Sequence, residues 1–110
     1  MTFGIIGSGA FGTALSISLS STNEKLILWT RNQDVVNSVQ EIRENRLRLP
    51  GYILPQNIIV TNDINQMGNC SIILIAVPMQ QLRSLVELHR SSLEGKILVA
   101  CCKGFEVSTG

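Results

Sequence analysis

Three glycines close to the amino terminus have the spacing that binds a phosphate group. Residues 2–15 read TFGIIGSGAFGTAL, in which a short apolar run meets Gly7, Gly9 and Gly12 before a helical pattern begins. Gly7 suits a tight turn out of a strand, Gly9 lets the backbone approach a pyrophosphate closely, and Gly12 lets the helix pack against the strand. The first N–H groups of that helix and the positive end of its dipole favour an anion. A glycine-rich turn without a ligand is the alternative interpretation.

The elements that must position this turn alternate between apolar strands and helices. Strands are predicted at 2–6, 25–29, 58–61, 71–77 and 96–102. A helical stripe of apolar and small residues follows the glycines, consisting of Phe11, Ala14, Leu15, Ile17, Ser18 and Leu19. Further helices are predicted after a cap at Asn32, briefly over 63–67, and from Leu82 through Leu93 to Gly95, and two prolines are expected to hold the connection 45–55 rigid. The alternation indicates an α/β fold, a Rossmann-type doubly wound parallel sheet with strand order 3-2-1-4-5, whose ligand crevice lies beyond strands 1 and 4.

Length and composition indicate one domain spanning residues 1–110. With a net charge of +1 and 45% hydrophobic residues, the chain has no electrostatic basis for binding nucleic acid or an anionic membrane. Its longest apolar run, 72–77, is too short to span a bilayer, and no basic region precedes Gly4 as in a signal peptide. Cys70, Cys101 and Cys102 lack metal-ligand spacing, which favours ordinary buried thiols in a reducing cytoplasm.

Several short motifs recur together along the chain. They are GSGAFGTAL at 7–15, LWTR at 28–31, REN at 43–45, LPG at 49–51, LP at 54–55, AVP at 76–78, LR at 82–83, KGFE at 103–106 and TG at 109–110. In this combination the chain resembles the amino-terminal third of the bacterial NAD(P)-dependent glycerol-3-phosphate dehydrogenases, through essentially all of its residues. The glycine motif alone would fit many dehydrogenase families.

The resemblance implies reversible reduction of dihydroxyacetone phosphate to sn-glycerol 3-phosphate, the backbone of phospholipids, with NAD or NADP as cofactor. It also implies a set of cofactor-binding residues, namely Gly7, Ser8, Gly9, Ala10, Phe11, Gly12, Arg31, Val77, Pro78 and Lys103. In the family the position of Lys103 lies near both substrate and cofactor, where an ammonium suits the substrate phosphate and the developing alkoxide. The alternative for Lys103 is a solvated cation at a strand end.

Arg31 predicts a preference for NADPH. It stands just past the second strand, where NAD-specific folds place an acidic residue on the ribose hydroxyls. An arginine there can bind a 2′-phosphate through two parallel hydrogen bonds. An ordinary exposed arginine is the alternative, and Asp34 lies too far into the next helix to replace the ribose acceptor.

Other conspicuous residues are interpreted as structural. His89 is predicted to be solvated, Trp29 and Phe11 to pack, although the family places the Phe11 position against the cofactor, and the arginines at 43, 46 and 48 to form a surface cluster. Three positions depart from the family: Ala10 replaces a usual serine, Met79 a usual serine or threonine, and Arg48 an expected aromatic residue. The alanine removes one hydroxyl contact near the pyrophosphate, which is worth about 1 kcal/mol.

The family's helical carboxy-terminal domain carries its proton-donating lysine and most contacts to the substrate phosphate, and these 110 residues contain neither it nor the later strands. We therefore assign no catalytic residue and expect the chain alone to lack reductase activity, with a separate polypeptide as one source of the second domain. We also expect residues 97–99, on an uncovered strand, to promote self-association. Two alternatives are a non-catalytic NAD(P)-binding module and another Rossmann reductase such as a ketopantoate reductase, against which Leu49–Gly51 and Lys103-Gly104 argue.

Overall fold

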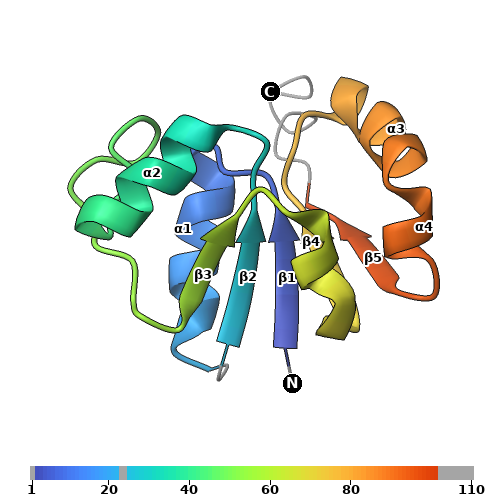
Figure 1. The fold of residues 1–110 in the computed structure, drawn as a ribbon, viewed down its shortest axis with the longest axis horizontal. Coiled ribbons are helices and arrows are strands. Elements are labelled where there is room, and N and C mark those ends of the chain that lie inside the picture. Colours follow the sequence, from blue (N-terminus) through green and yellow to red (C-terminus); the bar gives the residue numbers. More distant parts are fainter. Residues whose placement is uncertain (1, 23–24, 102–110) are drawn as a thin grey trace, which may run out of the picture.

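The computed structural model describes residues 2–22 and 25–101, which form a five-stranded parallel sheet with helices on both faces (Figure 1). The elements are β1 (Thr2–Ile6), α1 (Ala10–Ser20), β2 (Lys25–Trp29), α2 (Gln33–Ile42), β3 (Ile58–Thr61), the 3₁₀ helix η1 (Ile64–Asn69), β4 (Ile72–Ile75), α3 (Met79–Leu88), α4 (Arg90–Leu93) and β5 (Ile97–Ala100). The strand order β3-β2-β1-β4-β5 confirms the predicted fold class and topology. None of these helices is long and apolar enough to cross a membrane.

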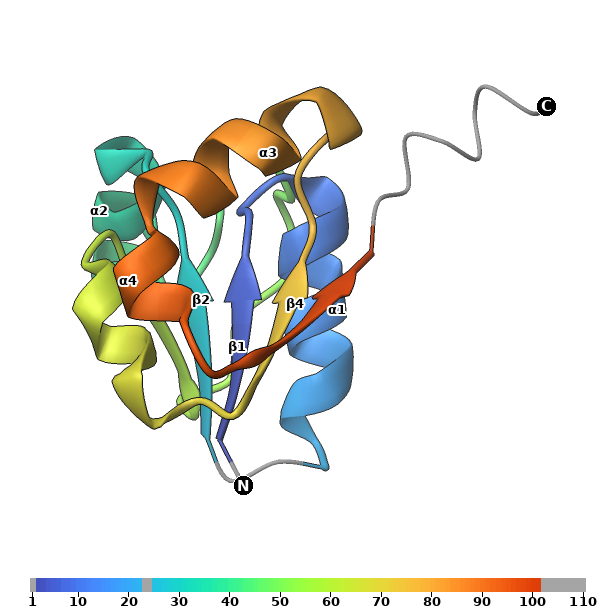
Figure 2. The same cartoon turned by 90° about the vertical axis from the view of Figure 1, so that its right-hand side faces the viewer.

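Successive residues of β1 serve two separate cores. Ile5 pairs with Leu28 on β2 and packs with α1 and α2, whereas Ile6 pairs with Trp29 and packs with η1, α3 and α4. Figure 2 shows α1 on one side of the sheet and the pair α3 and α4 on the other. Because both faces are covered, these strands are apolar without alternation, as the sequence indicated.

The buried face of α1 differs from the predicted stripe. Of the six predicted residues, Leu15, Ile17 and Leu19 pack against the core, whereas Phe11, Ala14 and Ser18 are exposed. The buried positions are small residues, namely Gly12, Thr13, Ser16 and Ser20. Small residues let the helix lie close to the sheet. Their hydroxyls are satisfied locally, since Ser16 donates to the carbonyl of Thr13 and Ser20 to that of Ile17, both at 2.7 Å.

Two predicted strands are shorter in the structure, and one predicted helix is divided in two. β4 ends at Ile75 and β5 at Ala100, and the single helix predicted up to Leu93 is two helices separated at His89. His89 has φ −111° and ψ 25°, outside helical geometry; its N–H closes α3 on the carbonyl of Leu85, and its own carbonyl starts α4. Gly95, with φ +81°, follows the second helix, consistent with its predicted role as a terminator.

Arg43 organises the connection between α2 and β3, so the surface role predicted for it is wrong. It adopts left-handed geometry at the end of α2, with φ 55°. Its guanidinium donates to the carbonyls of Leu54, Pro55 and Ile58, the last at 2.8 Å. These bonds, in addition to the prolines predicted to stiffen the segment, hold the loop against the sheet.

The outermost strand exposes large apolar side chains. Ile97 is 62% and Val99 41% exposed on β5. Because an apolar edge strand offers a template for pairing, we expect concentration-dependent self-association, reduced by Ile97→Lys. Light scattering at micromolar concentration is the measurement, with Ser18→Lys on the exposed face of α1 as the charge-matched control. A wild type that scatters as a monodisperse monomer would contradict the prediction.

Candidate functional site

Close packing within the protein requires glycine at two of the three motif positions, Gly7 and Gly12. Gly7 has φ +116°, and a Cβ there would lie 2.6 Å from the carbonyl oxygen of Ala76. A Cβ on Gly12 would lie 2.0 Å from the carbonyl oxygen of Gly7 and 3.3 Å from the Cβ of Ala76. The turn and the helix after it can therefore approach β4 only with glycine at both positions, as the spacing predicted.

Gly9 is different. Its φ of −65° and ψ of −178° are open to any residue, and a Cβ built on it meets no atom within 4 Å. Neither backbone strain nor packing within the described chain calls for glycine here. The open space beside Gly9 fits the role predicted for it, close approach of a ligand to the backbone.

The amino terminus of α1 carries no local anion. Gly9 is its cap residue and offers no side-chain hydrogen bond, and the first turn contains no acidic residue. In α2, by contrast, the amide oxygen of Asn32 accepts from the N–H of Asp34 at 2.9 Å, and Asp34 supplies negative charge in the first turn, as predicted. The end of α1 thus retains its preference for an external anion.

A network of hydrogen bonds around Ser8 fixes the backbone of the glycine turn. Ser8 donates its hydroxyl to Thr30 at 2.7 Å, and its carbonyl accepts from the side chains of Thr13 and Asn45, at 3.2 and 2.9 Å. Asn45 is fully buried, and its amide also donates to the hydroxyl of Thr13 at 2.9 Å. Sequence reasoning did not single out Asn45 as functional, and no local pattern could have done so, because its partners lie 32 and 37 residues away.

The turn opens into a cavity of about 350 Å³ at the carboxyl ends of β1 and β4, where the topology predicted a crevice. It is lined by Gly7, Ser8, Gly9, Trp29, Thr30, Arg31, Asn32, Arg48, Ala76, Val77, Pro78, Gln81 and Leu85. Six of the ten predicted cofactor-binding residues are among them. Ala10 and Phe11 lie on the exposed first turn of α1 and Gly12 is buried beneath it, while Lys103 and the side chain of Met79 lie outside the described part of the structure.

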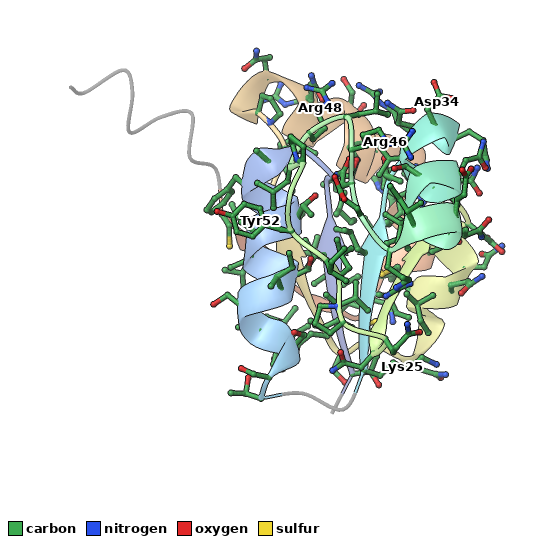
Figure 3. The ribbon with its side chains drawn as sticks, turned by 90° about the vertical axis from the view of Figure 1, so that its left-hand side faces the viewer. Lys25, Asp34, Arg46, Arg48 and Tyr52 are labelled. Carbon is green, nitrogen blue, oxygen red and sulfur yellow. The ribbon has the colours of Figure 1, made fainter. Side chains whose placement is uncertain are left out.

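Among the residues that the structure describes, two arginines and no carboxylate line this cavity. The exposed side chain of Arg31 donates from Nη2 to Oε1 of Gln81 at 3.3 Å, which places it against α3. Arg48, from the loop after α2, also lines the cavity, and its side chain is exposed, so the surface position predicted for it is confirmed. Figure 3 shows Arg48 and Arg46 at the end of the molecule opposite Lys25, where β2 begins. The charged side chains among the described lining residues are therefore all positive, which suits a phosphorylated ligand.

A second cavity of about 400 Å³ adjoins the first and shares Trp29, Arg31, Gln81 and Leu85 with it. His89 lies in its wall, with its ring in edge contact with the Trp29 indole at 5.2 Å between centroids, so the prediction of a solvated histidine without a partner is wrong. Trp29 is packed, as predicted, with 5% exposure. Its Nε1 is buried and has no hydrogen-bond partner among the residues described. Phe11, also predicted to pack, is 38% exposed.

Neither Cys70 nor Cys101 lines either of these two cavities. Burial raises the pKa of the Cys70 thiol, against which the positive charges of Lys96 and Lys25 act only in part. Cys70 is therefore protonated and inert near neutral pH. Cys101 is half-buried, and Cys102 falls outside the described residues. Over 2–22 and 25–101, no group of His, Cys, Asp and Glu side chains is placed to hold a metal ion.

The parallel sheet, the glycine turn and the cavity above it define a dinucleotide-binding domain of the Rossmann type. Residues 2–110 match the family model described as "NAD-dependent glycerol-3-phosphate dehydrogenase N-terminus". The chain belongs to this family, as the resemblance implied.

Individual proteins similar to this chain carry the same family name. The chain is 46% identical over 110 residues to a glycerol-3-phosphate dehydrogenase (NAD(P)+) of a Ruegeria species, and 38% identical over 112 residues to that of Neisseria meningitidis. The solved glycerol-3-phosphate dehydrogenase of Coxiella burnetii superposes with a TM-score of 0.85 at 26% identity, over 93% of this chain and 32% of that one. In both curated relatives the match covers all of this chain but 34% of theirs, so the chain spans about a third of their length.

Proposed function

We propose that this domain binds NAD(P)H for the reduction of dihydroxyacetone phosphate to sn-glycerol 3-phosphate in an enzyme that also contains a substrate domain. The observation that carries the proposal is Gly9, a glycine that the geometry of the described chain does not require, set beside an uncapped helix end and a cavity lined by two arginines. The names of the relatives supply the substrate class. A non-catalytic nucleotide-binding module would use the same cavity, and the family membership favours the dehydrogenase.

The residues present fit the cofactor. The first turn of α1 and the backbone at Gly9 would hold the pyrophosphate, and the network around Ser8 would keep the turn rigid. The second cavity, with the indole of Trp29 and the apolar side chain of Leu85, suits a flat nucleotide base. When bound, the nicotinamide supplies the hydride, and this domain contributes orientation of the cofactor over the sheet edge.

We further propose that the domain prefers NADPH through Arg31. The described lining residues of the two cavities include no carboxylate that would accept hydrogen bonds from the ribose hydroxyls of NADH, and Arg31 lines both cavities. A guanidinium recognises a 2′-phosphate by charge-assisted hydrogen bonds. The alternative is an exposed arginine whose role is limited to its hydrogen bond with Gln81.

Arg31→Ala is expected to weaken NADPH binding about tenfold and to leave NADH nearly unchanged. The factor is at the lower end for a charged hydrogen bond, because Arg31 is exposed to solvent and screened by salt. Calorimetric titration of each cofactor into wild type and variant is the measurement. Arg83→Ala, which removes an exposed arginine of α3 that lines neither cavity, is the control.

Equal weakening of the two cofactors by Arg31→Ala would remove the basis for the preference. A wild type that binds neither cofactor would overturn the proposed function as a whole.

A further inference from the structure

Among the described residues that line the site, Arg48 is the charged residue that comes from neither the glycine motif nor a strand end. It comes from the loop after α2 and lines the same cavity as Gly7, Ser8 and Gly9. The resemblance to the family does not predict an arginine here, because an aromatic residue is usual at this position. Among the residues described, its guanidinium makes no hydrogen bond or ion pair, and no carboxylate shares the cavity.

Asn45 ties Arg48 to the glycine turn. Its Oδ1 accepts from the N–H of Arg48 at 3.2 Å, while its Nδ2 donates to the carbonyl of Ser8 at 2.9 Å. The carbonyl of Asn45 also accepts from the N–H groups of Arg48 and Leu49, at 3.3 and 2.8 Å, which closes a tight turn. One fully buried amide therefore fixes the loop that carries Arg48 relative to the backbone of the turn.

The two arginines of the cavity are attached to different parts of the fold. Arg31 is hydrogen-bonded to Gln81 on α3, whereas Arg48 is linked through Asn45 to Ser8, directly before Gly9 and the start of α1. A phosphate group bound at the amino terminus of α1 would therefore share this cavity with the Arg48 side chain. A 2′-phosphate held by Arg31 lies toward α3.

We propose that Arg48 is a binding residue for the pyrophosphate of the dinucleotide, positioned by Asn45. The proposal rests on the proposed function, since it assumes that a dinucleotide occupies this cavity. Its guanidinium supplies a charge-assisted contact close to the turn in which Ala10 replaces the family's usual serine. Because NADH and NADPH share the pyrophosphate, Arg48 strengthens the binding of both and contributes nothing to the choice between them.

The test is calorimetric titration of NADH, NADPH and adenosine into wild type, Arg48→Ala and Arg48→Lys. Arg48→Ala is expected to weaken NADH and NADPH by the same factor, about three- to tenfold given the exposed side chain, and to leave adenosine unchanged. Arg48→Lys should retain part of the affinity, because it keeps the charge but loses the planar fork. Raising the salt concentration should shrink the difference between wild type and Arg48→Ala.

Arg46→Ala is the matched control. Arg46 is exposed on the same loop, two residues earlier, but it lines a separate depression with Asp34 and Glu41. Its removal lowers the net charge by the same amount and is expected to change cofactor affinity less than twofold. Thermal unfolding of all variants checks the fold, which should be unaffected because both side chains are exposed.

Three outcomes would overturn the proposal. If Arg48→Ala weakened the binding of NADPH alone, Arg48 would be a ligand of the 2′-phosphate. If Arg48→Ala had the same effect as Arg46→Ala, Arg48 would act only through the net charge of the protein. In both cases the proposed function would stand, since the wild type binds the cofactors. A wild type that bound neither cofactor would overturn the proposed function together with this inference.

Discussion

Replacement of Gly12 by alanine is expected to remove most of the stability of the fold. The added Cβ would lie 2.0 Å from the carbonyl oxygen of Gly7, and both groups belong to backbone that side-chain rotation cannot move. The start of α1 must shift away from the turn, which separates it from Ala76 on the opposite side. We expect a loss of about 3–5 kcal/mol, out of roughly 5–15 kcal/mol for a domain of ordinary stability.

Urea unfolding followed by circular dichroism measures this loss as a lower midpoint. Gly68→Ala is the control, because a Cβ at Gly68 meets nothing within 4 Å, and it should change stability by less than about 1 kcal/mol. An equal effect of the two substitutions would mean that α1 can move outward at little cost.

Replacement of Gly9 by alanine is expected to have the opposite profile: a stable fold that binds dinucleotide poorly. The backbone geometry of Gly9 accepts alanine and no described atom opposes the new Cβ, so stability should change by less than about 1 kcal/mol. The same Cβ would occupy the approach of the pyrophosphate to the turn. Loss of its charge-assisted hydrogen bonds corresponds to about ten- to a hundredfold in affinity.

Titration of NADH and NADPH into the Gly9→Ala variant is the measurement, and both cofactors should weaken equally because they share the pyrophosphate. Gly68→Ala again serves as the control and should bind like wild type. If Gly9→Ala bound both cofactors normally, the glycines would form only a turn, the alternative that the sequence left open.

The sheet was predictable because its signals are local. Strands covered on both faces are apolar throughout, and the cap at Asn32 and the glycine at Gly95 mark helix ends by their own geometry. The glycine turn was predictable for the same reason, since Gly7 and Gly12 are required by contacts within one strand–turn–helix unit and its neighbouring strand.

The packed face of α1 and the roles of Arg43 and Arg48 were not predictable, because they depend on contacts between residues far apart in the sequence. The predicted stripe of α1 held only in part: Leu15, Ile17 and Leu19 pack against the core. The most buried positions are small residues, because the helix lies so near the sheet that larger side chains do not fit there. Arg43 and Arg48 read alike in the sequence as surface cations. Only the folded loop shows that one binds three carbonyls and the other faces the cavity.

Trp29 gives the domain a built-in optical reporter. It is the single tryptophan of the chain, it lies in the walls of both cavities, and its indole is in edge contact with His89. Its fluorescence therefore arises from the site alone, with no background from other indoles. Reduced nicotinamide absorbs light in the region where tryptophan emits, so energy transfer from Trp29 follows occupancy by NADH or NADPH without any attached dye.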